Sequence, residues 1–263
     1  NVGDMRNTGI ELSLNADAIR TKDFDWNISL NLAHNENEVT RLSNDVFTMD
    51  KILLGDVFIR GGSSSGTHVL EEGRPIGQFY GLVCNGIDEN GRYILVDKDG
   101  DGEISDPADY DYIGSAQPKL TYGITNSFRY KNFDLSFFLR GTIGNDILNA
   151  TRMAYAQSGF LPGTNALDDP LTYTLSETPR FSNYYLEKGS FMRLDNLTLG
   201  YKIKALNGIR VYFTAQNLFV ITKYKGLDPE VPMDSGDGLT PGVEPREFYP
   251  KARTFSVGLN LNF

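Results

Sequence analysis

The chain has 263 residues, of which 40% are hydrophobic and 12% aromatic, with 27 glycines. This length suits one large domain, and the composition excludes a disordered or collagen-like chain. A net charge of −9 without a basic block argues against a nucleic-acid partner. The single cysteine, Cys84, excludes an intrachain disulfide and is expected as a buried or free thiol. No run approaches 18 consecutive apolar residues, so any membrane crossing would use β-strands.

The first 32 residues alternate apolar and polar side chains with the two-residue period of a β-strand. We expect one strand over residues 5–18 and a second over residues 24–32, joined by a polar turn. Both are long enough for a tilted membrane crossing, which needs about 9–11 residues. The apolar positions are Ile10, Leu12, Leu14, Ala16 and Ala18 in the first strand and Phe24, Trp26, Ile28, Leu30 and Leu32 in the second.

The alternation lapses between residues 36 and 118, where Gly, Ser, Asn and Asp are frequent. So long a connection is unusual in a compact domain but is expected on one side of a membrane barrel. Short apolar stretches over residues 78–83 and 92–96 predict β-structure within it. We interpret this segment as an external excursion with its own folded core.

A hairpin is predicted next, with strands over residues 120–130 and 133–143 joined by Lys131 and Asn132. The second long connection, residues 145–188, is expected to hold a short helix around residues 150–157. Its prolines, Pro162, Pro170 and Pro179, would interrupt any longer element.

The last three strands are expected over residues 191–204, 209–216 and 255–263, with a third long connection over residues 223–250. Arg193 and Asp195 break the alternation, which predicts a β-bulge or a projection beyond the bilayer. The final strand alternates without exception and ends on an aromatic residue. This pattern is typical of the closing strand of an outer-membrane barrel. A sandwich strand covered by a second sheet is the alternative.

Short turns near residues 20, 131 and 206 alternate with long connections after residues 36, 145 and 222. Outer-membrane barrels have short periplasmic turns and long extracellular loops. We therefore predict an all-β fold, a membrane antiparallel β-barrel segment of about seven strands. Residues 37–117, 146–189 and 223–250 would form extracellular loops, and the carboxyl terminus would be periplasmic.

Seven strands are fewer than the usual minimum of eight and cannot close a bacterial barrel. The residues after Asn1 also show no export signal. The sequence thus predicts a fragment, a processed product or one chain of several, with a missing amino-terminal polypeptide completing the barrel wall in outer-membrane lipid.

An acidic segment over residues 97–109 carries the clearest local motif. Asp97, Asp99 and Asp101 stand at alternate positions before a glycine, as in the opening of a calcium-binding loop. Glu103 would offer its backbone carbonyl, and Asp109 would close the loop. We predict that these five residues bind a structural Ca²⁺ ion, with a solvated acidic turn as the alternative.

The closing acid of such a loop stands at its twelfth position, which is Ala108 in this sequence. Asp109 must therefore reach the ion through a one-residue insertion, or Asp106 must take its place.

Signals of an enzyme are poor. The two histidines, His34 and His68, have no evident partner and are interpreted as polar strand-end or loop residues. There is no nucleophile elbow, and the glycine-rich residues 61–66 lack the lysine of a phosphate-binding loop. A barrel lipase or protease would need convergent Ser, His and acidic residues, which the sequence does not offer. We expect no catalytic residue.

Aromatic residues of the long connections could stack on sugars or grip peptides, although packing of the loops on one another is the favoured role. They include Tyr80, Tyr155, Tyr184, Tyr185 and Tyr224. Substrate-binding residues are not predicted.

Stretches spread over nearly the whole chain resemble the SusC/RagA family of TonB-dependent outer-membrane transporters of Bacteroidota. They are residues 73–81, 97–109, 113–115, 118–123, 133–138, 144–146, 191–201, 216–219, 226–230 and 249–250. The resemblance implies about the carboxyl-terminal third of a 22-strand barrel. The closing acid of the 97–109 loop is displaced from the spacing usual in that family.

In that family a plug domain closes the lumen, TonB pulls on a periplasmic segment, and a SusD-like lipoprotein covers the extracellular mouth. This chain shows neither plug nor TonB-contacting segment, so TonB would act through the missing part. The resemblance implies nutrient uptake, by import of oligosaccharides or peptides without covalent chemistry. The alternative is a barrel scaffold for surface lipoproteins or a secretion assembly.

Overall fold

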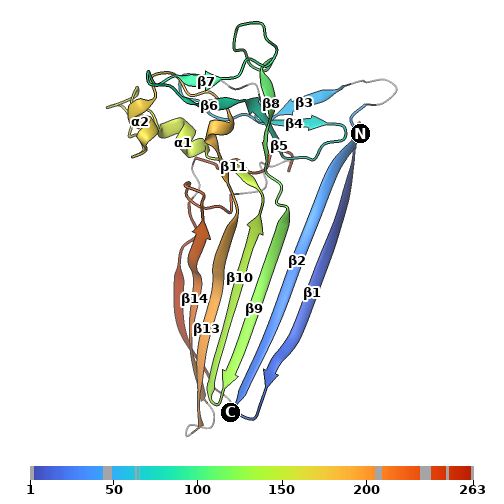
Figure 1. Cartoon of the computed structure of the whole chain (residues 1–263). Helices are drawn as coiled ribbons and strands as arrows, with labels where there is room; N and C mark the ends of the chain where they lie inside the picture. The colour runs from blue at the N-terminus through green and yellow to red at the C-terminus, as the bar shows by residue number, and fades with distance from the viewer. Residues whose placement is uncertain are drawn as a thin grey trace.

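The computed structural model describes residues 3–43, 49–62, 64, 66–204, 209–231, 238–246 and 249–261. Its main feature is an antiparallel seven-stranded sheet in the order β1-β2-β9-β10-β13-β14-β15 (Figure 1). The strands are β1 (Asp4–Arg20), β2 (Phe24–Arg41), β9 (Leu120–Tyr130), β10 (Phe133–Ile143), β13 (Phe191–Ile203), β14 (Ile209–Thr222) and β15 (Thr254–Asn260). The predicted all-β fold is confirmed.

The two ends of the sheet differ. Short turns join β1 to β2 and β9 to β10 at one end, here called the turn end. At the opposite end, the loop end, the long connections fold into a separate layer (Figure 1). We call this layer the loop subdomain and assign to it the described residues of 42–119, 144–190 and 223–253. The predicted turn at residues 205–208 lies outside the described residues.

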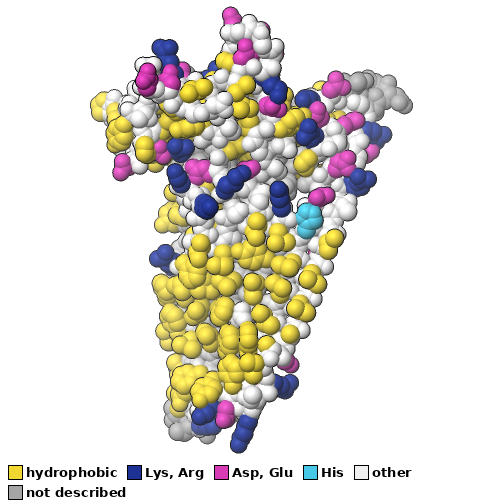
Figure 2. Space-filling view, viewed as in Figure 1, with side chains coloured by type: hydrophobic (Ala, Val, Ile, Leu, Met, Phe, Trp, Pro, Cys, Tyr) yellow, Lys and Arg dark blue, Asp and Glu magenta, His cyan; other side chains and the backbone are white. Residues whose placement is uncertain are grey.

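The strand register gives the sheet one apolar face. Leu14 pairs with Leu30, Leu30 with Ile124, and Ile124 with Leu139, so each apolar row runs across several strands. A one-residue slip would move every side chain to the other face, which is why the alternation fixes this register. Figure 2 shows the resulting apolar band, bordered by charged side chains at both ends of the sheet.

β2 and β14 are longer than the alternation predicts. β2 runs to Arg41. Near this end it is still paired with β1, and Arg6 of β1 lies opposite Glu38 of β2 and forms an ion pair of 2.5 Å with it. Both faces of β1 and β2 carry polar side chains here, so the hydrophobic period vanishes while backbone pairing continues. The first connection therefore begins after Arg41, and β14 likewise continues to Thr222.

The bulge predicted near Arg193 and Asp195 is present in β13. Its register against β10 and against β14 shifts between Leu194 and Asn196, which leaves Asp195 without an opposite residue. The extra residue lets Arg193 and Asp195 both approach the polar face of the sheet, where each contacts a charged partner.

The loop subdomain contains short elements. Its strands are β3 (Lys51–Leu54), β4 (His68–Glu71), β5 (Gln78–Leu82) and β8 (Tyr110–Ser115) in one sheet, β6 (Cys84–Ile87) with β7 (Tyr93–Leu95), and β11 (Asp146–Leu148) with β12 (Leu186–Lys188). Its helices are α1 (Ala150–Tyr155), α2 (Pro170–Thr174) and the 3-10 helix η1 (Asn183–Tyr185). The expected helix around residues 150–157 is confirmed as α1.

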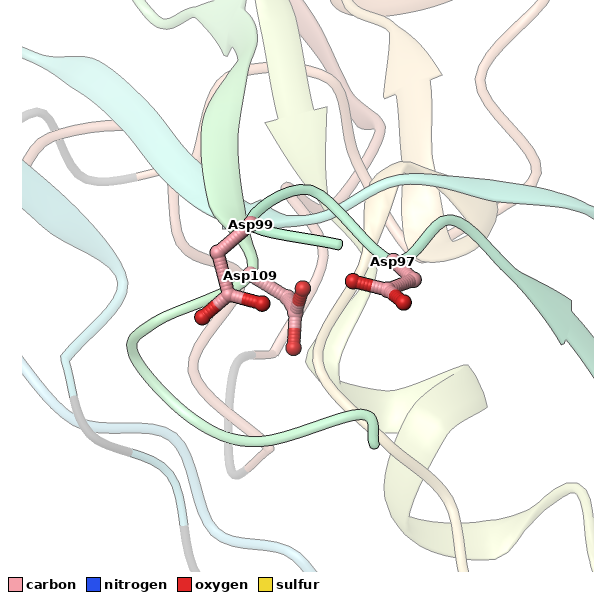
Figure 3. Close-up of side chains that lie close together, drawn as sticks. All are labelled: Asp97, Asp99 and Asp109. Atoms are coloured by element: carbon pink, nitrogen blue, oxygen red, sulfur yellow. The ribbon is translucent and has the colours of Figure 1, made fainter. Parts of the chain in front are cut away.

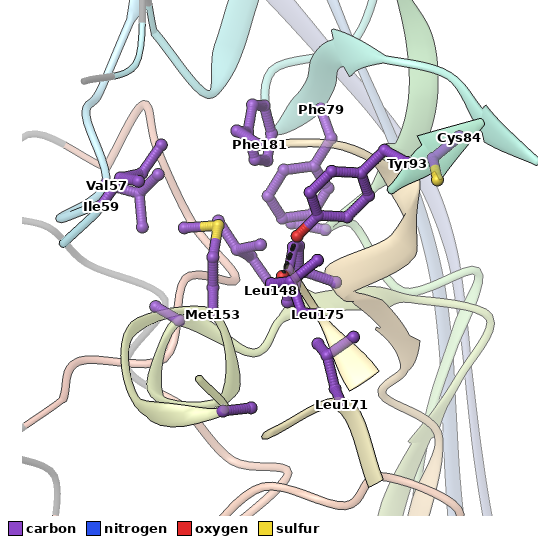
Figure 4. Close-up of a cluster of buried hydrophobic side chains, with 14 residues drawn as sticks. Val57, Ile59, Phe79, Cys84, Tyr93, Leu148, Met153, Leu171, Leu175 and Phe181 are labelled. Atoms are coloured by element: carbon purple, nitrogen blue, oxygen red, sulfur yellow. Dashed lines mark hydrogen bonds between the residues drawn. The ribbon is translucent and has the colours of Figure 1, made fainter. Parts of the chain in front are cut away.

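A hydrophobic core joins the first two long connections, as the sequence predicted for the first. Phe79, Leu148 and Met153 have no exposed surface, and Cys84 is buried beside them (Figure 4). Tyr93 and Tyr185 share a hydrogen bond between their hydroxyl groups within this core.

Helix α2 was not predicted, because Pro170 was interpreted only as an interruption. Asp169 caps the helix by accepting a hydrogen bond of 2.9 Å from the Leu171 backbone N–H. Proline at the first helical position lacks only an N–H that would have no helical partner, so Asp-Pro is a start signal. Within the described part of the chain, no helix reaches the length and hydropathy that a membrane-spanning helix requires.

Candidate metal centre and the polar face of the sheet

Three of the predicted metal ligands lie together at the far side of the loop subdomain. Asp97, Asp99 and Asp109 each place one carboxylate oxygen within 4.8 Å of the other two (Figure 3). Asp97 and Asp99 begin the acidic loop, and Asp109 comes directly before β8. A fixed strand therefore holds the last carboxylate against a loop that folds around it.

The loop backbone holds these carboxylates in place. Asp97 accepts hydrogen bonds from the N–H groups of Gly100, at 2.6 Å, and Gly102, at 2.9 Å. Both glycines have positive φ, at 78° and 89°, and no atom near the position of a Cβ. Glycine is thus needed for the backbone conformation and not for space.

Asp109 is fully buried and accepts hydrogen bonds from the N–H groups of Lys98, at 2.6 Å, and Ser105, at 2.8 Å. The hydrogen bond from Ser105, followed by that from Lys98, lowers the pKa of Asp109 below its ordinary value. Its carboxylate is therefore charged at neutral pH, as a metal ligand must be.

The remaining predicted ligands differ from this group. The Asp101 carboxylate accepts a hydrogen bond of 2.8 Å from the Glu103 N–H, and both side chains are exposed. Among the described residues, the converging carboxylates do not include Asp101 or Glu103. Asp106, the alternative closing acid, instead forms an ion pair of 2.5 Å with Arg180. The geometry favours Asp109 in the closing role.

The two histidines have structural partners. His68 is the first residue of β4 and is fully buried, with its ring nitrogens 2.9 Å from the Thr67 hydroxyl and from the Pro241 carbonyl. His68 therefore lies at a strand end, as expected, but it is buried in the core. His34 lies within β2, with Nδ1 2.6 Å from the Lys119 carbonyl.

The aromatic residues of the long connections mostly pack within the loop subdomain. Tyr185 and Tyr224 are buried, and Tyr224 donates a hydrogen bond of 2.5 Å to Glu244. Tyr80 packs on Tyr112, with ring centroids 5.2 Å apart. These contacts support the packing role that the sequence favoured.

A charge network lies on the polar face of the sheet near its loop end. Arg193 is 3% exposed and forms an ion pair of 2.5 Å with Asp228, which is equally buried. Arg140 on β10 contacts Glu230 at 2.5 Å and Asp195 at 2.9 Å. The network fastens the third connection to the inner surface of β10 and β13.

Sequence reasoning did not find this network, because Arg140 and Glu230 are 90 residues apart and no local motif links them. The available signals were the two charges at Arg193 and Asp195 inside a strand. A charge inside an apolar strand requires a partner, but the pattern does not say which residue supplies it.

Comparison with known proteins gives a consistent result. No family model matches the chain. The chain is 36% identical to the TonB-dependent receptor SusC of Bacteroides thetaiotaomicron, over all of this chain and 27% of the relative. It is 32% identical to the TonB-dependent receptor P3 of Formosa agariphila, over all of this chain and 29% of that relative.

Solved structures agree in fold. The match to the structure of the RagAB peptide transporter covers 98% of this chain and 29% of the transporter chain, with a TM-score of 0.76 and 27% sequence identity. The RagAB peptide importer in the open-open state gives a TM-score of 0.73 with 26% identity. The chain thus spans less than a third of the length of these relatives.

The seven-stranded sheet, with its apolar and polar faces, defines a segment of a β-barrel of the outer membrane. More narrowly, the chain is similar over its whole length to TonB-dependent receptors of the SusC/RagA family.

Proposed function

We propose that the chain forms part of the barrel wall of an outer-membrane importer for oligosaccharides or peptides. The observation that carries the proposal is the sheet itself, whose apolar face would contact lipid while its polar face lines the lumen. The match of the whole chain to part of SusC and the structural match to part of the RagAB peptide importer support import as the activity.

The sheet edges support a larger barrel. Within the described residues, β1 pairs only with β2, and β15 only with β14. Unpaired backbone groups in lipid cost several kcal/mol each. We therefore infer that other strands of a longer protein, of about 22 strands in all, continue the sheet at both edges. That protein would also supply the plug domain and the segment that TonB pulls.

We place the loop subdomain outside the cell and the turn end in the periplasm, because long connections are extracellular in outer-membrane barrels. A SusD-like surface lipoprotein would then cover the lumen on the loop side. Ligand capture would precede plug movement driven from the inner membrane.

Uptake measurements test this function. Cells with the intact gene should import a fluorescently labelled oligosaccharide or peptide that deletion mutants leave outside, and import should require TonB. Unchanged uptake combined with loss of a surface lipoprotein complex would instead favour the alternative of a barrel scaffold.

We also propose that Asp97, Asp99 and Asp109 bind Ca²⁺, with Asp101 and the Glu103 carbonyl completing the shell. Hard cations prefer oxygen ligands, and the glycines give the loop its required turn. The ion would cross-link the loop to the start of β8. It would therefore stabilise the loop subdomain without taking part in chemistry.

The Asp99→Asn variant of the full-length receptor tests the metal site. Asp99 is exposed and, among the described residues, accepts one backbone hydrogen bond, of 3.1 Å from the Asp101 N–H, which asparagine can keep. At a Ca²⁺ concentration of 100 times Kd, binding should stabilise the wild type by about 2.7 kcal/mol. Asp99→Asn should lose most of this gain, whereas Glu89→Gln should keep it. Equal melting of the wild type with Ca²⁺ and with EDTA would contradict the site.

A further inference from the structure

A recess lies at the border between the apolar face of the sheet and the loop subdomain. Its volume is about 440 Å³, within the range of about 300–1,000 Å³ that is common for small-molecule sites. Thr8 of β1 and His34 of β2 line its strand side. Thr8 lies next to Ile10 on the same face of β1, and His34 lies next to Leu32 on the same face of β2. Figure 2 shows a histidine and charged side chains at this border of the apolar band.

The edge of β2 leaves backbone groups free in the recess. β2 pairs with β9 only as far as Ala33, so beyond this residue its second edge faces the loop subdomain instead of a strand. Val39 uses its N–H and C=O on this edge, in two hydrogen bonds of 2.8 Å with the loop subdomain. Backbone groups on one edge of a strand belong to alternate residues, so Asn35 and Asn37 point theirs to the same side. These two N–H and two C=O groups form no hydrogen bond with any described residue.

Two charged side chains of the recess can also bind a ligand. Lys119 forms no ion pair with any described residue. Glu36 keeps 77% of its side chain exposed, although its carboxylate lies 3.3 Å from His34 Nε2. Arg6 and Glu38, which also line the recess, pair with each other at 2.5 Å. The recess therefore offers a cation to a phosphate and a carboxylate to an ammonium group.

The position of the recess indicates the kind of ligand. Ile10, directly beside the recess, is 74% exposed on the apolar face. A lipid whose chains cover Ile10 and Leu32 would bring its headgroup to the level of Thr8 and His34. Phosphate oxygens accept hydrogen bonds from N–H groups and lysine, whereas a primary ammonium group donates to carboxylates and carbonyls. A headgroup with both a phosphate and an ammonium group would use all the free groups of the recess.

We propose that this recess binds the headgroup of a membrane lipid that carries both a phosphate and a primary ammonium group. Lys119 and the N–H groups of Asn35 and Asn37 would bind the phosphate. Glu36 and the C=O groups of the same two asparagines would bind the ammonium group. The inference goes beyond import and rests on the proposed contact of the apolar face with lipid. The bound lipid would also cover the open edge of β2, which could otherwise pair with another chain.

Native mass spectrometry of the full-length receptor in detergent tests the headgroup site. The probes are phosphatidylethanolamine, phosphatidylcholine and phosphatidylglycerol with the same acyl chains. Phosphatidylethanolamine should bind most tightly, because choline has no N–H group to donate and glycerol has no positive charge. Glycerophosphoethanolamine, which lacks the chains, should not displace it at equal concentration. Equal binding of the three lipids, or displacement by the soluble headgroup or by an uncharged pentapeptide at equal concentration, would overturn the site.

Matched lysine variants locate the binding. Lys119→Met keeps the aliphatic stem that packs on Gly144 and removes the charge. It should weaken binding of phosphatidylethanolamine about fivefold, the contribution expected of one lysine at a membrane surface, whereas Lys119→Arg should keep the affinity. Lys223→Met is the control, because Lys223 is exposed after β14 at the same end of the sheet but lies outside the recess. Equal effects of Lys119→Met and Lys223→Met would overturn the site.

Glu36→Gln tests the ammonium side of the recess. This variant should weaken binding of phosphatidylethanolamine and leave phosphatidylglycerol unaffected, because only the former has an ammonium group. Equal losses for the two lipids would overturn the proposed headgroup. Cell uptake separates this site from the import function: gene-dependent import together with unselective lipid binding would contradict only the headgroup site, whereas absence of any gene-dependent import would contradict the function itself.

Discussion

The seven-stranded sheet and the loop subdomain place their apolar side chains in opposite environments. On the sheet, Ile10 and Val257 are 74% and 76% exposed. In the loop subdomain, Val69, Phe79 and Leu148 have no exposed surface. The same kinds of residue are thus displayed in one region and hidden in the other.

This difference shows which solvent each region is built for. Water-soluble proteins rarely expose a continuous apolar patch larger than a few hundred Å². The apolar band in Figure 2 covers the middle of the visible face of the sheet and is bordered by charged residues at both ends. The sheet therefore has lipid as its solvent, whereas the loop subdomain excludes water from its own core.

The largest expected effect separates the two kinds of apolar contact. Phe79→Ala should destabilise the loop subdomain by about 3–5 kcal/mol, because the rigid core leaves a cavity. Phe255→Ala on the apolar face should cost less, about 1.5–3 kcal/mol, because fluid lipid fills the space and only the transfer contribution is lost. Denaturant unfolding of the receptor in vesicles measures the loss of stability in each variant. Equal losses would contradict the proposed difference between the core of the loop subdomain and the apolar face of the sheet.

A charge on each face of one strand gives the next largest effect. Leu30→Arg lies near the middle of the apolar band, and should cost about 2–4 kcal/mol in vesicles. Ser29→Arg, one residue away on the polar face, should stay within about 1 kcal/mol of the wild type, because a water-filled lumen tolerates charge. Similar losses for the two variants would argue against lipid at the apolar face.

A smaller effect concerns a polar residue that lies on the apolar face. Asn126 is buried there, and its side-chain oxygen accepts a hydrogen bond of 3.0 Å from the Trp26 indole N–H. Trp26→Phe should cost about 0.5–2 kcal/mol, because it leaves Asn126 unpaired in an apolar environment. Adding Asn126→Leu should recover much of that loss. A double variant as unstable as the single one would show that the hydrogen bond is not the cause.

The smallest effect is a pH dependence confined to the loop subdomain. Because the folded-state pKa of Asp109 is lowered, its contribution to stability is present at neutral pH and is lost as pH falls below about 4. In EDTA, Asp109→Asn should flatten this part of the stability profile, and Glu89→Gln should leave it unchanged. Unfolding followed between pH 7 and pH 2, roughly the range over which carboxylates titrate, checks the slope.

The sequence was sufficient to predict the bounds of strands in which one face contacts lipid and the other is polar. The predicted hairpin strands, residues 120–130 and 133–143, have the observed bounds of β9 and β10. In these two strands the alternation of apolar and polar residues shows directly which face of the strand contacts lipid. Where polar residues occupy both faces, as in β2 from Asn35 to Glu38, the signal disappears although the strand continues to Arg41.

The candidate sites divide in the same way. A local loop holds all the predicted metal ligands, so the motif could bring Asp97, Asp99 and Asp109 together from sequence alone. The charge network joins Arg140 on β10 to Glu230 in the third connection, 90 residues apart in the chain. Only the strand order of the sheet and the path of the third connection bring such residues together.

The central claim is that the apolar face of the sheet contacts lipid, and spin labels on β1 test it most directly. Single labels at positions 12, 13, 14 and 15 of the receptor in vesicles should alternate. Leu12 and Leu14 should be accessible to oxygen dissolved in lipid, and Ser13 and Asn15 to a water-soluble nickel complex. Equal access of the nickel complex to all four positions would contradict the account.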